Sequence, residues 1–323
     1  MSVGTITAGP AVSAGPAPAH RRRSRLRQRI EIALFAGPAF LVYVTFVLVP
    51  VALAAVYSFF RWNGLQALTD FIGLENYRRA LSDPVFIGAI GHNLFVVGMS
   101  LIVQGPIAIG VALLLNRRLR GRTFFRVIIF IPYVLSEVIA AVSFKLLLQP
   151  AGPFDGFLHS IGLGSLKQLW LADSNVVLWV LFAVLTWKYV GFAIILFLAG
   201  LQGVPAELEE AGRIDGASWW QIQRHITIPL LAPTIRIWAF LSIIGALQLF
   251  DLVYIIWGQY VAATAGTSTM ATYMVVNGRN AANYGYGSAV AVVLFIISLI
   301  VALTYQRFVL RRDTEGALTE GKK

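Results

Sequence analysis

Residues 205 to 229 read PAELEEAGRIDGASWWQIQRHITIP, a polar stretch between two long apolar runs. Only 13% of the chain is charged, yet this stretch carries six charged side chains, too many for a segment inside lipid. Pro205 and the glutamates after it predict the first turn of a short helix, because acidic groups complement the positive end of a helix dipole. Asp215-Gly216 predicts a break, and Ser218 with Gln221 predicts a capping box for a second helix, with Pro229 closing the segment. We therefore expect a helix-turn-helix beside a membrane.

The composition places the chain among membrane proteins. Of its 323 residues 58% are hydrophobic, and the mean hydropathy is +0.74. It has no cysteine, which excludes disulfides and thiolate chemistry, and its four histidines are far apart. The net charge of +11 comes from basic clusters beside apolar runs, a pattern typical of membrane topology signals, so we predict no nucleic-acid partner.

Six apolar runs are long enough to cross a bilayer, which predicts an all-α polytopic membrane protein. Residues 1–30 read as a disordered basic tail, residues 31–312 as the transmembrane domain and residues 313–323 as a second tail. The first apolar run is too long for the core of a signal peptide, so we expect it to be a retained span. The six predicted spans are residues 32–60, 94–116, 124–148, 176–201, 230–257 and 286–308.

Lysines and arginines lie mostly on one side of these spans. Eighteen fall in the tails, the Arg117–Arg126 loop and the Pro205–Pro229 loop, whereas five fall in the alternating loops. Basic residues favour the cytoplasmic side of a membrane. The sequence therefore predicts a multi-pass protein of the cell membrane with both termini and the Pro205–Pro229 loop in the cytoplasm.

The polar stretch also resembles a family signature. Its segments Glu210-Ala211-Gly212, Asp215-Gly216-Ala217 and Ile226-Thr227-Ile228-Pro229 resemble the pattern E-A-A-x-x-D-G-A-x(8)-I-x-L-P of permease subunits in binding-protein-dependent ABC importers. Gly212 stands where the family usually has Ala, and Ile228 where it has Leu. The resemblance implies the ABC importer permease fold and makes residues 205–229 the coupling helix that docks on a cytoplasmic ATPase; the alternative is an ordinary interfacial helix. The coupling residues it implies are Glu210, Ala211, Gly212, Asp215, Gly216, Ala217, Ile226 and Pro229.

Two further phrases resemble the carbohydrate-uptake branch, which includes maltose, glycerol-phosphate and lactose permeases. They are FIGLENY at Phe71–Tyr77 and FDLVY at Phe250–Tyr254. The resemblance implies half of the translocation pathway of an ATP-driven importer of a di- or oligosaccharide. Its partners would be a second similar permease, two ATP-binding subunits and an extracytoplasmic solute-binding protein.

The chain lacks the sequence motifs of an ATPase and of other enzymes. No G-x-x-x-x-G-K-[ST] phosphate loop occurs, so ATP and Mg²⁺ are expected on the partner ATPase and no cofactor on this chain. No catalytic motif occurs either, so we predict a transport subunit and not an enzyme. The alternative function is a secondary transporter of a polar solute, driven by an ion gradient through charged residues in the spans.

Five residues are candidates for the substrate path. Gln248, Asp251 and Tyr254 follow one another at helical spacing, so we expect them on one helix face that offers polar groups and an aromatic ring to a sugar. Asp251 could instead be a structural cap. Glu137 and Lys188 fall near the middle of neighbouring spans, and we expect them to pair because an isolated charge in lipid is costly. They would either border the path or only fix the packing of the spans.

Two outer segments complete the prediction. Phe71–Phe86 predicts a short amphipathic helix with Glu75 in its first turn and Asp83-Pro84 as its stop. This helix would either have the role that the same phrase has in carbohydrate-uptake permeases or only pack over the ends of the spans. Gly258–Tyr286 is rich in Gly, Thr, Ala and Asn, which predicts an outer loop that either binds a partner or is merely mobile.

Overall fold

The computed structural model describes residues 25–117, 121–264 and 266–310, and within these ranges it is helical with no strand. Residues 1–24 and 313–323 of the predicted tails lie outside the described residues, whereas α1 begins at Arg25, inside the predicted first tail. The α-helices are α1 Arg25–Tyr43, α2 Val49–Tyr57, α3 Glu75–Ser82, α4 Pro84–Met99, α5 Gly105–Asn116, α6 Arg122–Val134, α7 Glu137–Leu147, α8 Pro153–Ser160, α9 Val177–Leu201, α10 Ala206–Ile214, α11 Trp219–Ile222, α12 Ile228–Leu247, α13 Asp251–Thr264, α14 Met270–Met274 and α15 Tyr284–Tyr305. Shorter π-helical or 3-10 turns are η1 Val44–Leu48, η2 Ser100–Gln104, η3 Gly164–Leu166, η4 Gln223–Thr227, η5 Val275–Asn280 and η6 Gln306–Leu310.

The chain divides into two units, one up to Ala52 and one from Leu53 onward. The described part of the first unit holds α1, η1 and the start of α2. Its side chains are apolar and exposed, with Phe35 at 83% and Phe46 at 73%. No helix in the described part of its own unit covers this surface, and so many exposed apolar side chains are typical of a helix that faces lipid or another packed segment. This agrees with the first predicted span.

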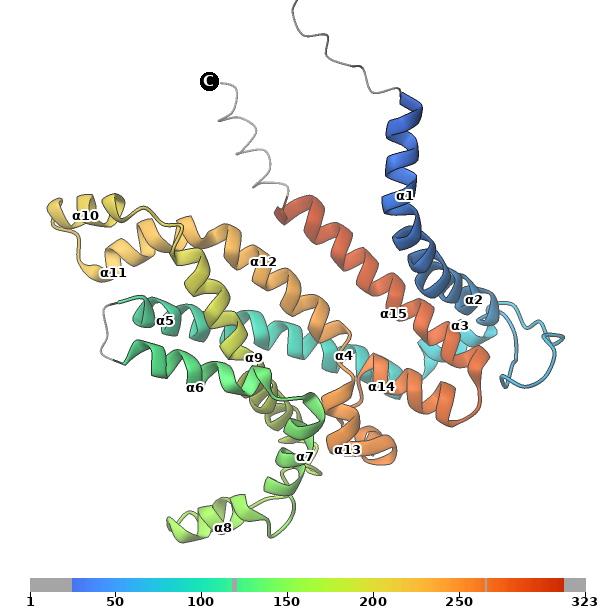
Figure 1. Ribbon diagram of the computed structural model, residues 1–323. Helices are drawn as coiled ribbons and strands as arrows, with labels where there is room; N and C mark the ends of the chain where they lie inside the picture. The colour runs from blue at the N-terminus through green and yellow to red at the C-terminus, as the bar shows by residue number, and fades with distance from the viewer. Residues whose placement is uncertain (1–24, 118–120, 265, 311–323) are drawn as a thin grey trace, which may run out of the picture. The chain divides into compact units, whose positions relative to one another are not determined.

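The second unit is built around α9. Helices α4, α5, α6 and α12 all contact it, and α15 contacts α3, α12 and α14 (Figure 1). Leu181 and Phe197 on α9 are fully buried. A helix that is apolar on all sides is suited to the centre of a membrane bundle, and the part of α9 that its neighbours leave open, such as Trp179 at 55% exposure, is apolar too.

The predicted all-α membrane fold is confirmed, and the six predicted spans correspond to five or six membrane-length helices of the described residues. Five helical stretches are long and apolar enough to cross a membrane, and the bent pair α6 and α7 makes a sixth. The second stretch starts at Pro84, ten residues before the predicted start of that span. The reason is Asp83, which caps the C-terminal end of α3 and is also the N-cap of α4. The Asp83 side chain accepts hydrogen bonds from the backbone N–H groups of Val85, at 2.8 Å, and Phe86, at 3.4 Å.

Two predicted spans are not continuous helices. The helix predicted over 124–148 bends by 93° between Val134, the end of α6, and Glu137, the start of α7. Ser136 causes this restart, because its backbone is extended and its hydroxyl caps the N–H of Ile139 at 3.3 Å. The helix predicted over 230–257 is interrupted between Leu247 and Asp251.

The FIGLENY phrase secures the C-terminal end of α2. The Asn76 side chain donates hydrogen bonds to the carbonyl oxygens of Ser58, at 2.9 Å, and Phe60, at 3.0 Å. The hydroxyls of Tyr77 and Ser58 are 2.6 Å apart. The predicted short helix is confirmed as α3 with Glu75 in its first turn, and these contacts fasten it over the end of the preceding helix.

The segment Gly258–Tyr286, predicted as a loop, is largely helical, whereas its role in binding a partner stays a prediction. Helix α13 is broken at Gly258, where φ of 69° and ψ of −172° are not helical, and a second helical stretch runs on to Thr264. Helix α14 and the turn η5 follow it. Thr269 and Met270 are fully buried, and Thr269 forms a capping box with Thr272. The small residues that suggested a loop instead allow close packing, since a Cβ on Gly278 would lie 2.7 Å from the Cα of Gly287.

Gly191 allows α6 and α9 to touch through their backbones. A Cβ at this position would lie 2.1 Å from the carbonyl oxygen of Ile129. We predict that Gly191→Ala forces the helices apart and destabilises the protein by about 1–3 kcal/mol, the usual cost of overpacking. The purified protein should melt at a lower temperature. Gly110→Ala on α5 is the control, because nothing lies within 4 Å of its Cβ position; equal melting temperatures for both variants would contradict the prediction.

Candidate functional site

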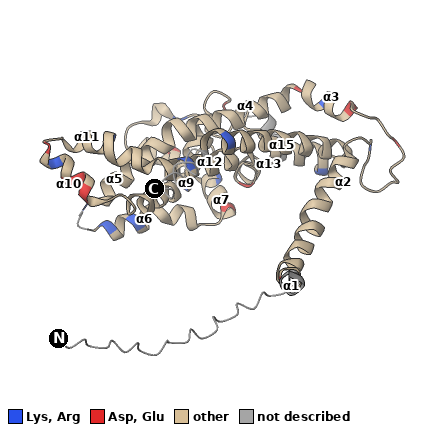
Figure 2. Ribbon diagram, turned by 90° about the horizontal axis from the view of Figure 1, so that it is seen from above, with Lys and Arg blue, Asp and Glu red and all other residues tan. Residues whose placement is uncertain are grey.

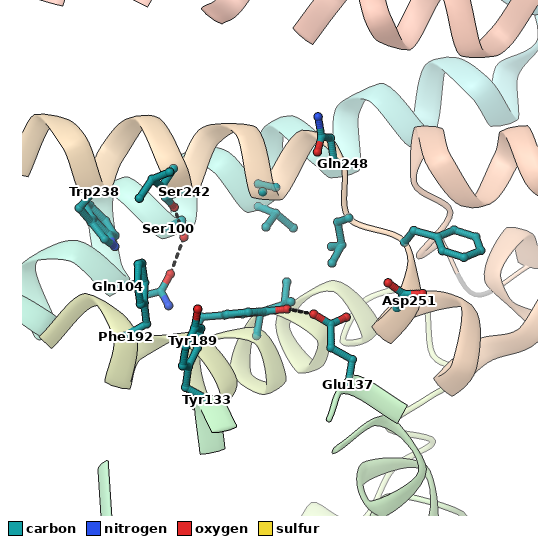
Figure 3. A pocket seen from close by; sticks show the side chains of 17 residues that line it. Ser100, Gln104, Tyr133, Glu137, Tyr189, Phe192, Trp238, Ser242, Gln248 and Asp251 are labelled. Carbon is teal, nitrogen blue, oxygen red and sulfur yellow. Dashed lines mark hydrogen bonds between the residues drawn. The ribbon is translucent and has the colours of Figure 1, made fainter. Parts of the chain in front are cut away.

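A cavity of about 420 Å³ lies where the two interrupted helices meet. The end of α6 and the start of α7 form one wall, and the end of α12 and the start of α13 form another (Figure 3). Helix α9 and the turn η2 complete it. The lining residues are Val96, Ser100, Gln104, Tyr133, Glu137, Leu185, Tyr189, Phe192, Trp238, Leu241, Ser242, Gly245, Ala246, Gln248, Leu249, Phe250 and Asp251.

Hydrogen-bonding groups line opposite sides of this cavity. On one side the hydroxyl of Tyr189 donates to the Glu137 carboxylate. On the other side the Ser242 hydroxyl donates to Ser100, at 3.0 Å, and Ser100 donates to the side-chain carbonyl of Gln104. Ser100 and Gln104 bound a π-helical turn, a feature that often marks functional sites.

Aromatic rings provide flat apolar faces beside these polar groups. The rings of Tyr133 and Phe192 stack with their centroids 5.0 Å apart, and Tyr133 meets Tyr189 edge-on at 6.3 Å. Trp238 lines the far end of the cavity (Figure 3). A mainly apolar pocket with a few convergent polar groups is the usual form of a small-molecule site.

Lys188 holds the break between α6 and α7. It is 2% exposed, and its ammonium group donates to the carbonyl oxygens of Pro132, at 3.1 Å, Tyr133, at 3.0 Å, and Leu135. The predicted direct pair between Lys188 and Glu137 does not form. The lysine instead binds the free carbonyls at the negative end of α6, and Glu137 lies in the first turn of α7, where a carboxylate is favoured.

Asn93 and Thr269 hold the second break, between α12 and α13. The fully buried Asn93 side chain donates to the carbonyl of Ala246, at 2.6 Å, and accepts from the N–H of Met270, at 2.9 Å. The Thr269 hydroxyl donates to the carbonyl of Leu249 at 2.7 Å. Neither residue was among the sequence candidates. The lone Asn in the apolar run around position 93 was the available signal, because polar side chains within spans usually bond to something specific.

The structure brings three of the five predicted path residues together. Glu137, Gln248 and Asp251 line the cavity, whereas Lys188 and Tyr254 do not. The Tyr254 hydroxyl accepts a hydrogen bond from Asn280 at 3.2 Å. The predicted single face through 248, 251 and 254 is wrong, because α12 ends at Leu247 and a new helix starts at Asp251.

The polar stretch forms the predicted pair of short helices, α10 and α11. Charged residues are concentrated on α10, at the start of α6 and again on α3, while the long helices between them carry few (Figure 2). The capping box of Ser218 and Gln221 is confirmed, whereas Pro205 is the N-cap of α10 and not part of its first turn. Pro229 does not end the segment, because it lies in the first turn of α12, which continues directly from α11 and η4.

Gly216 ends α10 in a left-handed conformation with φ of 79°. The N–H of Gly216 bonds to the carbonyl of Arg213 at 3.1 Å, and the N–H of Ala217 bonds to that of Gly212 at 2.9 Å, which together make a Schellman motif. Nothing lies within 4 Å of the position that a Cβ on Gly216 would take, so a side chain would meet no neighbour there. The backbone conformation alone therefore calls for glycine here.

Gly212 and Glu209 fix α10 against the helix that follows it. A Cβ on Gly212 would lie 3.1 Å from the Ile226 side chain, so the glycine in place of the signature alanine gives a closer approach. The Glu209 carboxylate accepts from the Thr227 hydroxyl at 3.1 Å and lies 3.5 Å from the Arg213 guanidinium. One side of α10 is thus held against η4 by packing at Gly212 and by the hydrogen bond of Glu209.

The opposite side of the two helices is open. Ile214 is 86% exposed and Trp220 is 60% exposed, both unusual for apolar side chains on a charged loop. The signature residues Glu210, Ala211 and Asp215 are exposed on this loop, and Asp215, Gly216, Ala217 and Ile226 help to line a shallow depression of about 320 Å³. A loop braced on one side and open on the other is suited to docking a partner.

A bundle of membrane-length helices around a mainly apolar cavity with a few polar groups, together with a braced polar loop, is the arrangement of a membrane transport protein. The chain matches the family of binding-protein-dependent transport system inner membrane components over residues 104–314. It is 35% identical to the multiple sugar-binding transport system permease protein MsmF of Streptococcus mutans, over 81% of this chain and 89% of that protein. It is 33% identical to the arabinooligosaccharides transport system permease protein AraP of Bacillus subtilis, over 84% of this chain and 85% of that protein.

A solved structure shares the fold. It is a bacterial alginate ABC transporter in complex with an alginate pentasaccharide-bound periplasmic protein, similar with a TM-score of 0.77 and 23% identity over 88% of this chain and 96% of that chain. The chain thus belongs to the family of inner membrane permease components of binding-protein-dependent transport systems. It is a multi-pass membrane transport subunit and not an enzyme, and this membership gives the ion-gradient alternative no support.

Proposed function

We propose that this chain is the permease subunit of an ATP-driven importer of a di- or oligosaccharide and forms half of its translocation pathway. The observation that carries the proposal is the cavity between the two broken helices, where aromatic faces lie beside hydroxyl, amide and carboxylate groups. Sugars present both hydroxyls and apolar C–H faces, so such a wall suits them. Relatives named for transport of arabinooligosaccharides and of multiple sugars support the same class of substrate.

Glu137, Gln248 and Asp251 would contact the sugar hydroxyls. Glu137 is oriented by Tyr189, and Gln248 and Asp251 flank the break after α12. Tyr254 would act further out, where its ring stacks on Phe250 with centroids 5.0 Å apart. In a pathway shared by two subunits, a second similar permease would supply the opposite wall.

The open side of α10 and α11 would dock on an ATP-binding subunit that carries ATP and Mg²⁺. The coupling residues would be Glu210, Ala211, Gly212, Asp215, Gly216, Ala217, Ile226 and Pro229, of which Gly212 and Ile226 act by bracing the loop and Pro229 by starting α12. Two ATP-binding subunits and an extracytoplasmic solute-binding protein would complete the importer. ATP-driven closure of the ATPases would move the docked loops and switch the access of the cavity.

Both termini would lie in the cytoplasm, with the coupling loop. A contact supports this arrangement: the Arg117 guanidinium lies over the Trp219 ring, 5.0 Å from its centroid. The Arg117–Arg126 and Pro205–Pro229 loops, both predicted to be cytoplasmic, thus lie at the same end of the second unit, as the positive-inside rule expects.

Reconstitution of the whole importer in proteoliposomes tests the proposal. Radiolabelled arabino- and malto-oligosaccharides, supplied with the solute-binding protein, should accumulate only when the ATP-binding subunits have ATP and Mg²⁺. A variant of those subunits that cannot hydrolyse ATP is the control and should show no accumulation. Uptake that follows an imposed ion gradient without ATP, or ATP-driven uptake of a solute that is not a saccharide, would contradict the proposal.

Gly216→Val should uncouple the importer. A branched side chain at φ of 79° costs about 1–2 kcal/mol or more, so the Schellman motif and the turn into α11 would distort. We expect the variant to insert in the membrane normally but to lose most ATP-driven uptake. Less of the ATP-binding subunit should also co-purify with it than with the wild type. Gly216→Asn is the matched control, because Asn tolerates this conformation, and it should keep most of the activity. Wild-type uptake by Gly216→Val would remove this turn from the coupling mechanism.

A further inference from the structure

We infer that Lys188 is a positioning residue for the transport cavity: its ammonium group holds the broken end of α6 and thereby sets where Tyr133 and Glu137 lie in the cavity wall. The inference rests on the proposed role of the cavity. It differs from the sequence expectation, in which Lys188 was a candidate for direct contact with the substrate.

The three donors of the lysine are all used within the chain. An ammonium group has three N–H donors and no acceptor. In this protein they meet three carbonyl oxygens, those of Pro132, Tyr133 and Leu135. Lys188 is 2% exposed and does not line the cavity. It has no donor left for a sugar hydroxyl, so its effect on the cavity must pass through the backbone that it holds.

The carbonyls that Lys188 binds would otherwise lack partners. The last carbonyls of a helix have no intrahelical donor, and α6 ends within a predicted membrane span, where the chain turns by 93°. A buried carbonyl without a partner is unfavourable, and the negative end of the helix dipole favours a cation there. A lysine from α9 satisfies both requirements at once.

The geometry of α9 brings the lysine to this place. Gly191 lies three residues later on the same face of α9, and it is the point where α6 approaches so closely that a Cβ would lie 2.1 Å from the Ile129 carbonyl oxygen. The contact at Gly191 sets the distance between the two helices, and Lys188 then reaches the end of α6 about one turn further along.

The neighbour of Lys188 holds the other side of the break. Tyr189 follows directly on α9, and its hydroxyl donates to Glu137, the first residue of α7. Its ring also meets Tyr133, the residue whose carbonyl Lys188 binds. Two consecutive residues of α9 thus hold the end of one helix and the start of the next. Loss of the lysine should let the wall formed by Tyr133 and Glu137 shift.

Thiol labelling of the empty importer tests this role without depending on the substrate. The chain has no cysteine, so Gly245→Cys would introduce its single thiol into the cavity wall, at a position with nothing within 4 Å of the Cβ. The labelling rate with a water-soluble maleimide, measured without saccharide on the assembled complex, reports access to the cavity. We expect Lys188→Met to change this rate at least threefold and Lys188→Arg, which keeps the donors, to restore most of it. Lys145→Met is the control, because Lys145 is an exposed lysine on α7.

Saccharide uptake supplies the second measurement. Lys188→Met should raise the apparent KM about tenfold or more while the basal ATP hydrolysis of the complex is retained, and Lys145→Met should match the wild type. An unchanged labelling rate in Lys188→Met would overturn the inference, even if uptake fell, because a direct contact with sugar would leave the empty cavity unaltered. If Lys188→Met does not assemble, Lys188→Gln replaces it under the same criteria. If Lys188→Met changes the labelling rate but the wild-type importer takes up no saccharide, the proposed substrate is refuted and the positioning role of Lys188 stands.

Discussion

Backbone carbonyls that a broken helix releases inside an apolar bundle must find new partners, because lipid offers none. This chain breaks two of its membrane-length helices and satisfies each break with a buried polar side chain from a neighbour. Lys188 binds the end of α6, Asn93 binds a carbonyl in the last turn of α12, and Thr269 binds a carbonyl just after it. The breaks in turn create the cavity, because they leave polar residues such as Glu137 and Asp251 at helix starts that face the interior.

The cavity and the polar loop are connected by two continuous helices. Helix α9 carries Tyr189 in the cavity wall and ends at Leu201, just before the loop, and α12 leaves the loop and carries Ser242 back to the cavity. Within the loop, Gly212 packs against Ile226 of η4, which continues directly into α12. In the proposed importer, a displacement of the loop by the ATPase would therefore reach the cavity through rigid elements and not through a flexible linker.

Hydropathy predicted the helical class and the approximate spans, because the thickness of the bilayer core sets the minimum length of each apolar run. The turn chemistry of Ser218 and Gly216 was also readable, since capping depends on local sequence. The breaks were missed because their flanks are as apolar as the rest of the spans, although Ser136 before Glu137 is a local start signal. Asn93 and Thr269 could not be paired with carbonyls far along the chain from sequence alone, since that depends on how the helices pack. The small residues around Gly278 were misread as a loop for the same reason.

Modification of a single cavity thiol in the working importer tests most directly whether this cavity is the transport path. Gly245→Cys lines the cavity and Gly110→Cys lies on α5 away from it, and neither position has atoms within 4 Å of its Cβ. A bulky water-soluble maleimide should abolish ATP-driven saccharide uptake in the first variant, and a membrane-permeant maleimide should leave uptake in the second unchanged. Full uptake by the quantitatively modified Gly245→Cys importer would contradict the account.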